Sequence, residues 1–367
     1  MKITKLPLFL IVTVIVGSMF LSACAGGAGI ATSWPGVLVD TKAETVYLAY
    51  STHVYAVNLS NGIEKWRFPE KPDNKKQFFA PPVLDAGNQL IEGGYDHVVY
   101  SINPDNGQQN WTFAGANDKY IGSVLANGDN IYAPNTNTNL YNIDANGKLR
   151  WMFTVNHALW AQPITDGNYI YVASMDHHVY AIDAVKGSQV WETQDLGGAV
   201  TLSFAYDPSG VLYVGTLGGV MYAVDIKNGQ LLWQTPAKGW IWSKPVLDNG
   251  SLYFGDQNGN VFALEANNGQ IKWQIQPDAS SPDRAVISSP IVVGETLYFA
   301  SQAGLLYAID KTNGEDIWGG PKTIGGKIYS DLKLANDMIL ITPNDFDSLL
   351  LAVDLQGKNL WSYMPAK

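Results

Sequence analysis

The sequence predicts an all-β fold, a single eight-bladed β-propeller built of four-stranded antiparallel blades. Three observations predict it: a short unit ending in tryptophan occurs eight times, successive tryptophans lie 40 to 45 residues apart, and the segments between them alternate apolar and polar residues. An interval of about 40 residues has room for four short strands and three turns, the content of one propeller blade.

The repeated unit reads VYAIDAVKGSQVW in the fourth copy and MYAVDIKNGQLLW in the fifth. The acidic residue of this unit can accept hydrogen bonds from the backbone N–H groups of the turn, and its glycine can adopt a positive φ at no steric cost. We expect each tryptophan ring to lie over a neighbouring turn and sheet. Eight tryptophans are therefore interpreted as structural docking residues: Trp66, Trp111, Trp151, Trp191, Trp233, Trp273, Trp318 and Trp361.

The fourth copy shows how one blade is composed. We expect residues 161–165 to form the inner strand, residues 169–174 the second, residues 179–183 the third and residues 188–193 the outer strand. Residues 169–174 alternate apolar and polar side chains, as a half-buried strand does, and turn residues separate the four segments.

We expect the first and the last blade each to be complete, with four strands of their own. The expected strands cover residues 34–39, 45–50, 53–59 and 63–68 in the first blade, and residues 327–334, 338–342, 349–354 and 358–364 in the last. We therefore predict that the ring closes by packing of the last blade against the first, without a strand borrowed from the other end.

The segment before the repeats has the layout of a secretory signal, with Lys2 and Lys5 followed by an apolar stretch over residues 8–20. The sequence Leu-Ser-Ala-Cys that ends at Cys24 resembles the bacterial lipobox, which implies cleavage before Cys24 and lipidation of its thiol. We expect this organisation: a lipoprotein signal peptide at residues 1–23, a lipidated tether at 24–33 and the propeller at 34–367.

Cysteine content and charge exclude several classes of function. Cys24 is the only cysteine, so the chain can form neither an intramolecular disulfide nor a zinc site built on thiolates. The formal charge is −10, and it becomes −12 once residues 1–23 with their two lysines are removed. Such an acidic surface repels phosphate backbones, so we expect no nucleic-acid partner.

The fullest form of the repeat, Ala-x-Asp-x-x-x-Gly-x-x-x-Trp, resembles the pyrroloquinoline-quinone-type propeller repeat, known as a tryptophan-docking motif. The resemblance covers about residues 34–364. Enzymes with this repeat hold the quinone and a calcium ion under a disulfide of adjacent cysteines, whereas this chain has one cysteine and no long insertions between blades. We therefore expect no cofactor and no catalytic residues, and a quinoprotein dehydrogenase is kept as an alternative.

The histidines do not predict a metal site. His53, His97, His177 and His178 are expected in the turns between the second and third strands of three separate blades. The adjacent pair points to opposite faces of one strand. We interpret all four as polar turn residues.

A better candidate for a binding surface lies at the start of the inner strands, where five of the eight blades have an aromatic residue. These residues are Trp34, Phe79, Trp160, Trp242 and Tyr329. Inner strands begin near the central channel, so the rings are candidates for a patch at one mouth of the channel, near Gln162, Lys244 and Asp331. The alternative is that the rings pack between blades.

The loops that follow the outer strands vary most, and loops on one rim are where propellers usually carry recognition. The variable loops are residues 69–77, 115–119 and 276–284, with the basic residues Lys71, Lys75, Lys76 and Arg284. These cations are suited to an acidic partner, and solvated linkers explain them equally well.

A lipid-anchored eight-bladed propeller of this length resembles the family of B-type lipoprotein subunits of the outer-membrane β-barrel assembly machinery. The resemblance implies a non-enzymatic scaffold that binds a protein partner in the cell envelope. It also implies a place on the periplasmic face of the outer membrane, or on the outer face of the cytoplasmic membrane in a cell without one. No partner-contact motif matches residue by residue, and a sensor for small molecules or carbohydrates is a further alternative.

Overall fold

The computed structural model describes residues 34–344 and 347–366, which form eight four-stranded antiparallel sheets. The predicted all-β, eight-bladed propeller is thereby confirmed. Cys24, the signal peptide and the tether lie outside the described residues. The part of the chain that the structure describes contains no helix long and apolar enough to cross a lipid bilayer.

The blades follow one another in chain order, and each strand pairs with the next. Blades one and two comprise β1 (Gly36–Asp40), β2 (Thr45–Tyr50), β3 (His53–Asn58) and β4 (Glu64–Phe68), then β5 (Val83–Leu84), β6 (Leu90–Gly93), β7 (Val99–Ile102) and β8 (Gln109–Phe113). Blades three and four comprise β9 (Leu125–Asn127), β10 (Asn130–Pro134), β11 (Asn139–Asp144) and β12 (Leu149–Thr154), then β13 (Ile164–Thr165), β14 (Tyr169–Ala173), β15 (Val179–Asp183) and β16 (Gln189–Glu192).

The second half of the chain repeats this order. Blades five and six comprise β17 (Ala205–Asp207), β18 (Val211–Gly215), β19 (Val220–Asp225) and β20 (Leu231–Pro236), then β21 (Val246–Asp248), β22 (Ser251–Gly255), β23 (Val261–Glu265) and β24 (Ile271–Ile275). Blade seven comprises β25 (Ile291–Val293), β26 (Thr296–Ala300), β27 (Leu305–Asp310) and β28 (Lys322–Thr323). Blade eight comprises β30 (Lys333–Ala335), β31 (Met338–Ile341), β33 (Leu350–Asp354) and β34 (Asn359–Tyr363), beside a small pairing of β29 (Lys327–Ile328) with β32 (Pro343–Asn344).

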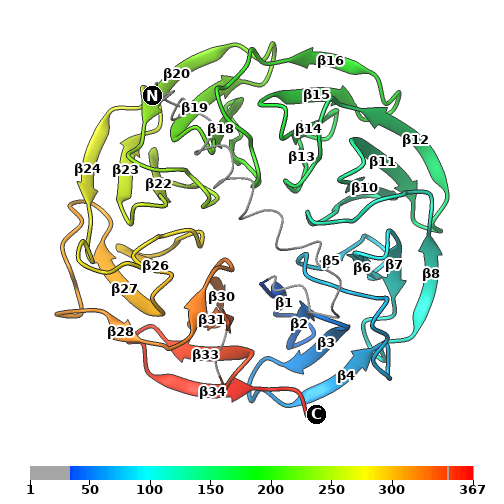
Figure 1. Ribbon diagram of the computed structural model, residues 1–367, viewed down its shortest axis with the longest axis horizontal. Coiled ribbons are helices and arrows are strands. Elements are labelled where there is room, and N and C mark those ends of the chain that lie inside the picture. The colour runs from blue at the N-terminus through cyan, green and yellow to red at the C-terminus, as the bar shows by residue number, and fades with distance from the viewer. Residues whose placement is uncertain (1–33, 345–346, 367) are drawn as a thin grey trace, which may run out of the picture. The chain divides into compact units, whose positions relative to one another are not determined.

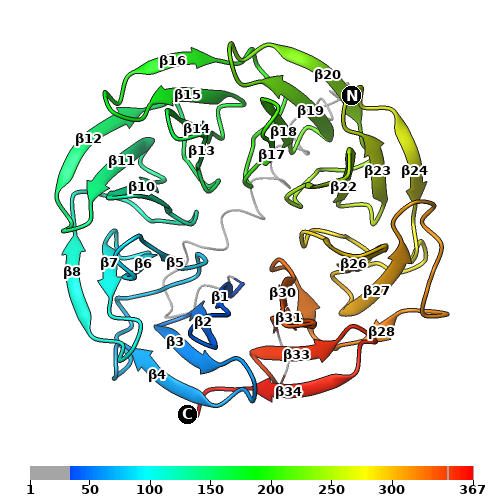
Figure 2. The same ribbon diagram turned by 180° about the vertical axis from the view of Figure 1, so that it is seen from behind.

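Taken by itself, the unit that begins at Trp34 is a ring of blades around a central axis, with the inner strands toward the axis and the outer strands on the rim (Figures 1 and 2). The hydrophobic core is divided among the blade junctions, because each of eight buried clusters contains residues of two neighbouring blades. The strands that form these clusters are buried on both faces, which explains their nearly continuous apolar sequences.

The ring closes as predicted, since the first and last blades each take their four strands from one stretch of chain. Leu48 and Tyr55 of blade one share a buried cluster with Leu340 and Tyr363 of blade eight. The Tyr363 hydroxyl donates to Glu64 Oε2 over 2.6 Å, and the Ser330 hydroxyl donates to the carbonyl oxygen of Pro35, also over 2.6 Å. Side-chain packing and a few hydrogen bonds therefore replace strand exchange at this junction.

The expected inner strands were too long. In blade four the inner strand is β13, two residues instead of the expected 161–165, and in blade eight the expected 327–334 is divided into β29 and β30. Gln162 shows why in blade four: its side chain donates from Nε2 to the Val124 carbonyl of blade three over 2.9 Å. The beginning of this segment thus bonds to the neighbouring blade, and only its end pairs within its own sheet.

Connections alternate between the two sides of the ring, because four antiparallel strands return the chain to its starting side. One side carries the segments that link successive blades together with the turns between second and third strands, and we call it the linker face. The other side carries the turns between first and second and between third and fourth strands, and we call it the hairpin face. The two faces therefore differ in kind, and the inner strands begin on the linker face.

Candidate functional site

Three of the five aromatic residues at the inner-strand starts meet on the linker face. The rings of Trp34 and Tyr329 stack with centroids 5.7 Å apart and planes at 25°, and Trp34 contacts Trp242 edge to face at 6.1 Å. All three side chains are partly buried, and the Tyr329 hydroxyl accepts a 3.0 Å hydrogen bond from Gln302 Nε2. These residues come from blades one, six and eight, so the cluster joins non-adjacent parts of the ring. We call Trp34, Trp242 and Tyr329 the aromatic cluster.

The other two aromatic residues of this position are elsewhere. Phe79 is buried between Tyr50 and Tyr95, with ring centroids 6.1 Å and 5.0 Å away. Trp160 is partly buried, and its indole N–H is buried without a partner among the described residues. The repeat position is therefore not one continuous patch: Phe79 packs between blades, and only the aromatic cluster is assembled from several blades.

A polar layer follows two residues further along the inner segments. The backbone N–H of Lys244 donates to Ser289 Oγ over 2.9 Å, and the backbone N–H of Ser289 donates to Asp331 Oδ1 over 3.0 Å. Lys333 Nζ lies 3.9 Å from Asp331 Oδ2. Burial lowers the pKa of Lys244, while Asp331 opposes this shift and Lys333 adds to it. The layer links blades six, seven and eight on the side of the ring that carries two members of the aromatic cluster.

The eight docking tryptophans connect each blade to the next. A Cβ built on the turn glycine of each following blade would lie 2.5 to 3.3 Å from the ring of the preceding tryptophan. Six indole N–H groups also donate to a backbone carbonyl of the following blade over 2.8 to 3.1 Å, namely those of Trp66, Trp111, Trp151, Trp191, Trp233 and Trp273. The turn itself has the expected geometry, since Asp183 Oδ1 accepts from the N–H groups of Val185 and Lys186 and Gly187 has φ 67°.

The interpretation of His53 as a turn residue was wrong, whereas its expected place at the start of the strand over residues 53–59 is confirmed. His53 is the first residue of β3, only 5% exposed, and its Nδ1 lies 2.9 Å from the Thr52 hydroxyl. Burial lowers its pKa. His97 and His177 do occupy turns with positive φ, at 71° and 76°. Only residues 51 and 52 separate β2 from β3, whereas residues 174–178 separate β14 from β15, so His53 falls in the strand while His178 stays in the turn.

The adjacent histidines are held separately. His177 Nδ1 lies 3.2 Å from Asp195 Oδ1, whereas His178 Nδ1 donates to the Thr193 carbonyl oxygen over 2.7 Å. Across residues 34–344 and 347–366, no group of three or more histidine, cysteine, aspartate or glutamate side chains is placed to hold a metal ion. The pair serves to attach the turn of blade four to the segment after its outer strand.

Two of the basic residues in the variable loops are engaged by the propeller itself. Lys76 Nζ lies over the rings of Phe68 and Tyr100, 5.4 and 5.1 Å from their centroids. Arg284 donates from Nε to the Asn258 carbonyl over 2.9 Å and from Nη1 to two further carbonyls. Such contacts stabilise the loops, so these two cations are less accessible to a partner than the sequence pattern indicates.

The linker segments are held on both sides, which makes the linker face rigid. The segment between blades five and six is typical: the Ile241 N–H donates to the Thr216 carbonyl of blade five, and the Gln257 N–H of blade six donates to the Trp240 carbonyl. The same pair of hydrogen bonds recurs in the other linkers from blade one to blade seven, as with Tyr120 to Gly94 and Thr136 to Lys119. Binding here would require little ordering of the backbone.

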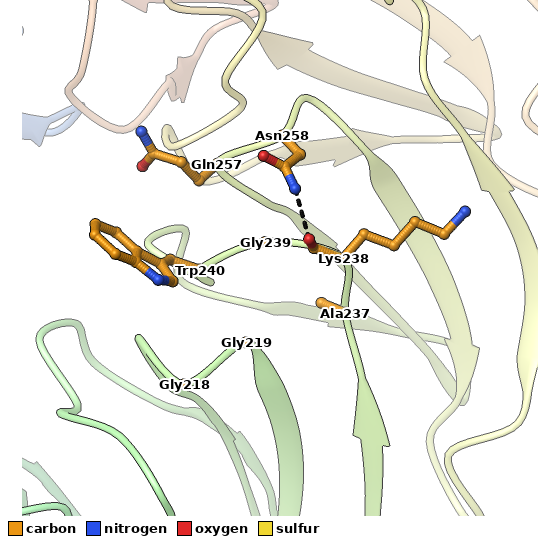
Figure 3. Close-up of a pocket in the computed structure, with 8 residues that line it drawn as sticks. All are labelled: Gly218, Gly219, Ala237, Lys238, Gly239, Trp240, Gln257 and Asn258. Carbon is orange, nitrogen blue, oxygen red and sulfur yellow. Dashed lines mark hydrogen bonds between the residues drawn. The ribbon is translucent and has the colours of Figure 1, made fainter. Parts of the chain in front are cut away.

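The sequence pattern missed a hollow of about 460 Å³ on the linker face, between blades five and six. Its lining residues are Gly218, Gly219, Ala237, Lys238, Gly239, Trp240, Gln257 and Asn258 (Figure 3). Trp240 is 56% exposed and is the one aromatic residue among the exposed large apolar side chains of the described part of the chain. The repeat alignment contains a signal for Trp240, because the residue at this linker position is small or polar in the other blades described.

Comparisons with known proteins agree with this architecture. A family model described as outer membrane protein assembly factor BamB matches residues 95–207 and 193–337. The crystal structure of BamB from Moraxella catarrhalis is similar with a TM-score of 0.70 at 15% identity, covering 84% of this chain and 92% of that one. The crystal structure of the computationally designed Ika8 protein has a TM-score of 0.66 at 12% identity, covering 80% and 91%. No curated protein matches the sequence significantly.

Proposed function

Because the chain belongs to the family described as outer membrane protein assembly factor BamB, we propose that it is a non-enzymatic, membrane-anchored scaffold that binds a protein partner during assembly of outer-membrane or other envelope proteins. The observation that carries the proposal is the aromatic cluster on the linker face. Aromatic side chains are enriched among the residues that dominate binding energy at protein interfaces. The family supports a role as a scaffold, and the aromatic cluster is the surface that we propose binds the partner.

The rigidity of the linker segments also supports the proposal that the partner binds on the linker face. Each linker from blade one to blade seven is bonded to the turns of the blades before and after it, so little conformational entropy is lost when a partner binds. Trp242 belongs to the linker between blades five and six, and Tyr329 to the segment before β30. The segment of Tyr329 is held instead by the pairing of β29 with β32 and by the hydrogen bond from Gln302. A partner that contacts both rings would therefore meet a prearranged surface.

Membrane attachment is proposed through Cys24, which lies outside the described residues. Acyl chains on this cysteine would each contribute about 0.8 kcal/mol per buried methylene group. The site of action is then the periplasmic face of an outer membrane, or the outer face of the cytoplasmic membrane in a cell that has one membrane. Cys24→Ala would release the protein from the membrane fraction.

The experiment is a pull-down of the lipidated protein from its own membranes, with bound proteins identified by mass spectrometry. Wild type, Cys24→Ala and the double variant Trp242→Ala/Tyr329→Ala are compared, with circular dichroism to show that the propeller is intact. Recovery of an envelope β-barrel protein by wild type, and its loss in the double variant, would support the proposal. Equal recovery by the folded double variant would contradict the assignment of the surface, and no specific protein with wild type would contradict the scaffold itself.

A further inference from the structure

Trp240 occupies a position at which the fold needs only a backbone carbonyl. Its carbonyl accepts a 2.9 Å hydrogen bond from the Gln257 N–H. In five other linkers the same carbonyl bond is made by small or polar residues, namely Gln77, Lys119, Ala158, Ala199 and Ala285. An alanine suffices for the fold here, so the indole of Trp240 is not explained by the architecture.

The indole is presented by a fixed segment of chain. The Ala237 N–H donates to the Gly219 carbonyl over 2.8 Å, and Asn258 Nδ2 donates to the Lys238 carbonyl over 2.5 Å. Together with the bond to the Trp240 carbonyl, these contacts from both neighbouring blades fix the backbone before and after Gly239. The ring itself is left 56% exposed to water beside the hollow.

Three glycines of the lining, Gly218, Gly219 and Gly239, bring the loops around the hollow close together. A Cβ on Gly218 would lie 2.5 Å from the Gly197 carbonyl oxygen, and one on Gly239 would lie 3.0 Å from Asn258. Four loops therefore approach one another closely at these glycines, which leave no room for larger side chains. The primary amide of Gln257 lies on the same side as the Trp240 ring (Figure 3) and can both donate and accept.

We propose that this hollow is a binding site for a neutral carbohydrate, with one sugar ring stacked on Trp240 and its hydroxyl groups bonded by the amides of Gln257 and Asn258. The C–H face of a pyranose ring is apolar and matches an exposed indole. Its equatorial hydroxyls lie in the ring plane, where planar amides can bond them. The lining offers the apolar ring of Trp240 beside the polar amides of Gln257 and Asn258, as a ligand with both kinds of face requires.

The charge of the lining favours a neutral ligand. Among the described residues that line the hollow there is no carboxylate, and the one cation, Lys238, extends away from Trp240 and Gln257 (Figure 3). A peptide that is anchored at an interface gains most binding energy from an apolar pocket that excludes water. This hollow, in contrast, is open and partly polar. The site is separate from the aromatic cluster proposed to bind the protein partner, so the two proposals can fail independently.

The test is isothermal titration of the lipidated protein with maltotriose, cellotriose and triacetylchitotriose. A zwitterionic detergent is required, since a glycoside detergent would itself present a sugar. We expect saturable binding of at least one trisaccharide, a dissociation constant raised about tenfold or more by Trp240→Ala, and a smaller increase with Trp240→Phe or Gln257→Ala. Trp240 is exposed and belongs to none of the buried clusters, so Trp240→Ala should leave the thermal unfolding curve unchanged.

Two variants serve as controls. Leu232→Ala removes a side chain that is 53% exposed beside another hollow on the hairpin face, and Lys238→Ala removes the cation that points away from Trp240 and Gln257. Both should bind the trisaccharide as wild type does. Absence of saturation by about 10 mM for all three sugars, equal binding by Trp240→Ala, or preference for an oligouronate that depends on Lys238 would overturn the proposal. Loss of the protein partner in Trp240→Ala without any sugar binding would assign the indole to a protein contact instead.

Discussion

The indole of Trp361, at the end of the last blade, lies against Gly62 in the first: a Cβ built on Gly62 would be 2.6 Å from Trp361 Cε3. The glycine of the repeat therefore has two tasks. It adopts a φ of 73°, a conformation that costs free energy in residues with a Cβ. It also leaves space for a ring that comes from the preceding blade. At this junction the contact closes the ring.

Gly62→Ala should lower the free energy of unfolding by about 2 to 4 kcal/mol. The alanine would have to keep the left-handed backbone conformation, and its Cβ would collide with the packed ring of Trp361. The matched control is Gly128→Ala, since Gly128 has φ 57° and no atom within 4 Å of the added Cβ. We expect the control to cost about 1 kcal/mol. Urea unfolding of both variants measures the difference, and equal costs would show that the Trp361 contact does not stabilise closure.

Two docking tryptophans should respond differently to removal of the indole N–H. Trp191 Nε1 donates to the Ile226 carbonyl over 2.8 Å, whereas Trp361 Nε1 is buried with no partner among the described residues. Trp191→Phe leaves a carbonyl unpaired and should cost about 1 to 2 kcal/mol more than Trp361→Phe. Chemical denaturation of the pair tests this, and a larger cost for Trp361→Phe would mean that its N–H has a partner in solution.

The closure junction should weaken in acid. Burial opposes the ionisation of Glu64, but hydrogen bonds from Arg67 and Tyr363 prevail and hold its pKa below the ordinary value of 4.5. A carboxyl with a lowered folded pKa stabilises the protein above its unfolded pKa, and this contribution is lost as the pH falls through the folded pKa. Unfolding free energies of wild type and Glu64→Gln should therefore converge as the pH falls below about 4.5 and through the lowered folded pKa of Glu64.

Tyr363→Phe provides an independent check of the same junction. The substitution removes the 2.6 Å bond to Glu64 and should cost about 1 to 2 kcal/mol near neutral pH. In the Glu64→Gln background the cost should be smaller, because the acceptor is no longer charged. An identical cost in both backgrounds would show that the hydroxyl and the carboxylate are not coupled.

Glu92 is a buried acid at an apolar position. It is 1% exposed in β6, both carboxyl oxygens lack partners among the described residues, and burial raises its pKa well above the ordinary value. The matching residues in other second strands include Leu48, Val172 and Phe254. Glu92→Leu should therefore stabilise the protein by about 1 to 3 kcal/mol at pH 7.

The pH dependence of this gain has a definite sign. A carboxyl whose folded pKa is raised contributes stability below its unfolded pKa, and that contribution is lost as the pH rises through the folded value. The difference between Glu92→Leu and wild type should thus grow as the pH rises above about 4.5. Thermal melts from pH 4 to pH 8 measure it. Destabilisation by Glu92→Leu at pH 7 would show that the carboxyl is paired in solution.

The repeat in the sequence by itself determined the fold, the number of blades and the manner of closure. It could do so because each turn is local: Asp183 and Gly187 act on backbone groups within a few residues, and their spacing is visible in the chain. The boundaries of inner strands could not be read in this way. Their first residues bond to a neighbouring blade, as Gln162 does.

The candidate site depended on tertiary structure. Trp34, Trp242 and Tyr329 share one repeat position with Phe79 and Trp160, yet the first three meet and Phe79 is buried between blades. The position of a residue in the repeat sets how far its ring lies from the axis, whereas the contacts of that ring depend on the side chains of other blades. The repeat alignment marks Trp240 only as an unusual residue of its linker, and its exposure becomes visible only once the loops around it are assembled.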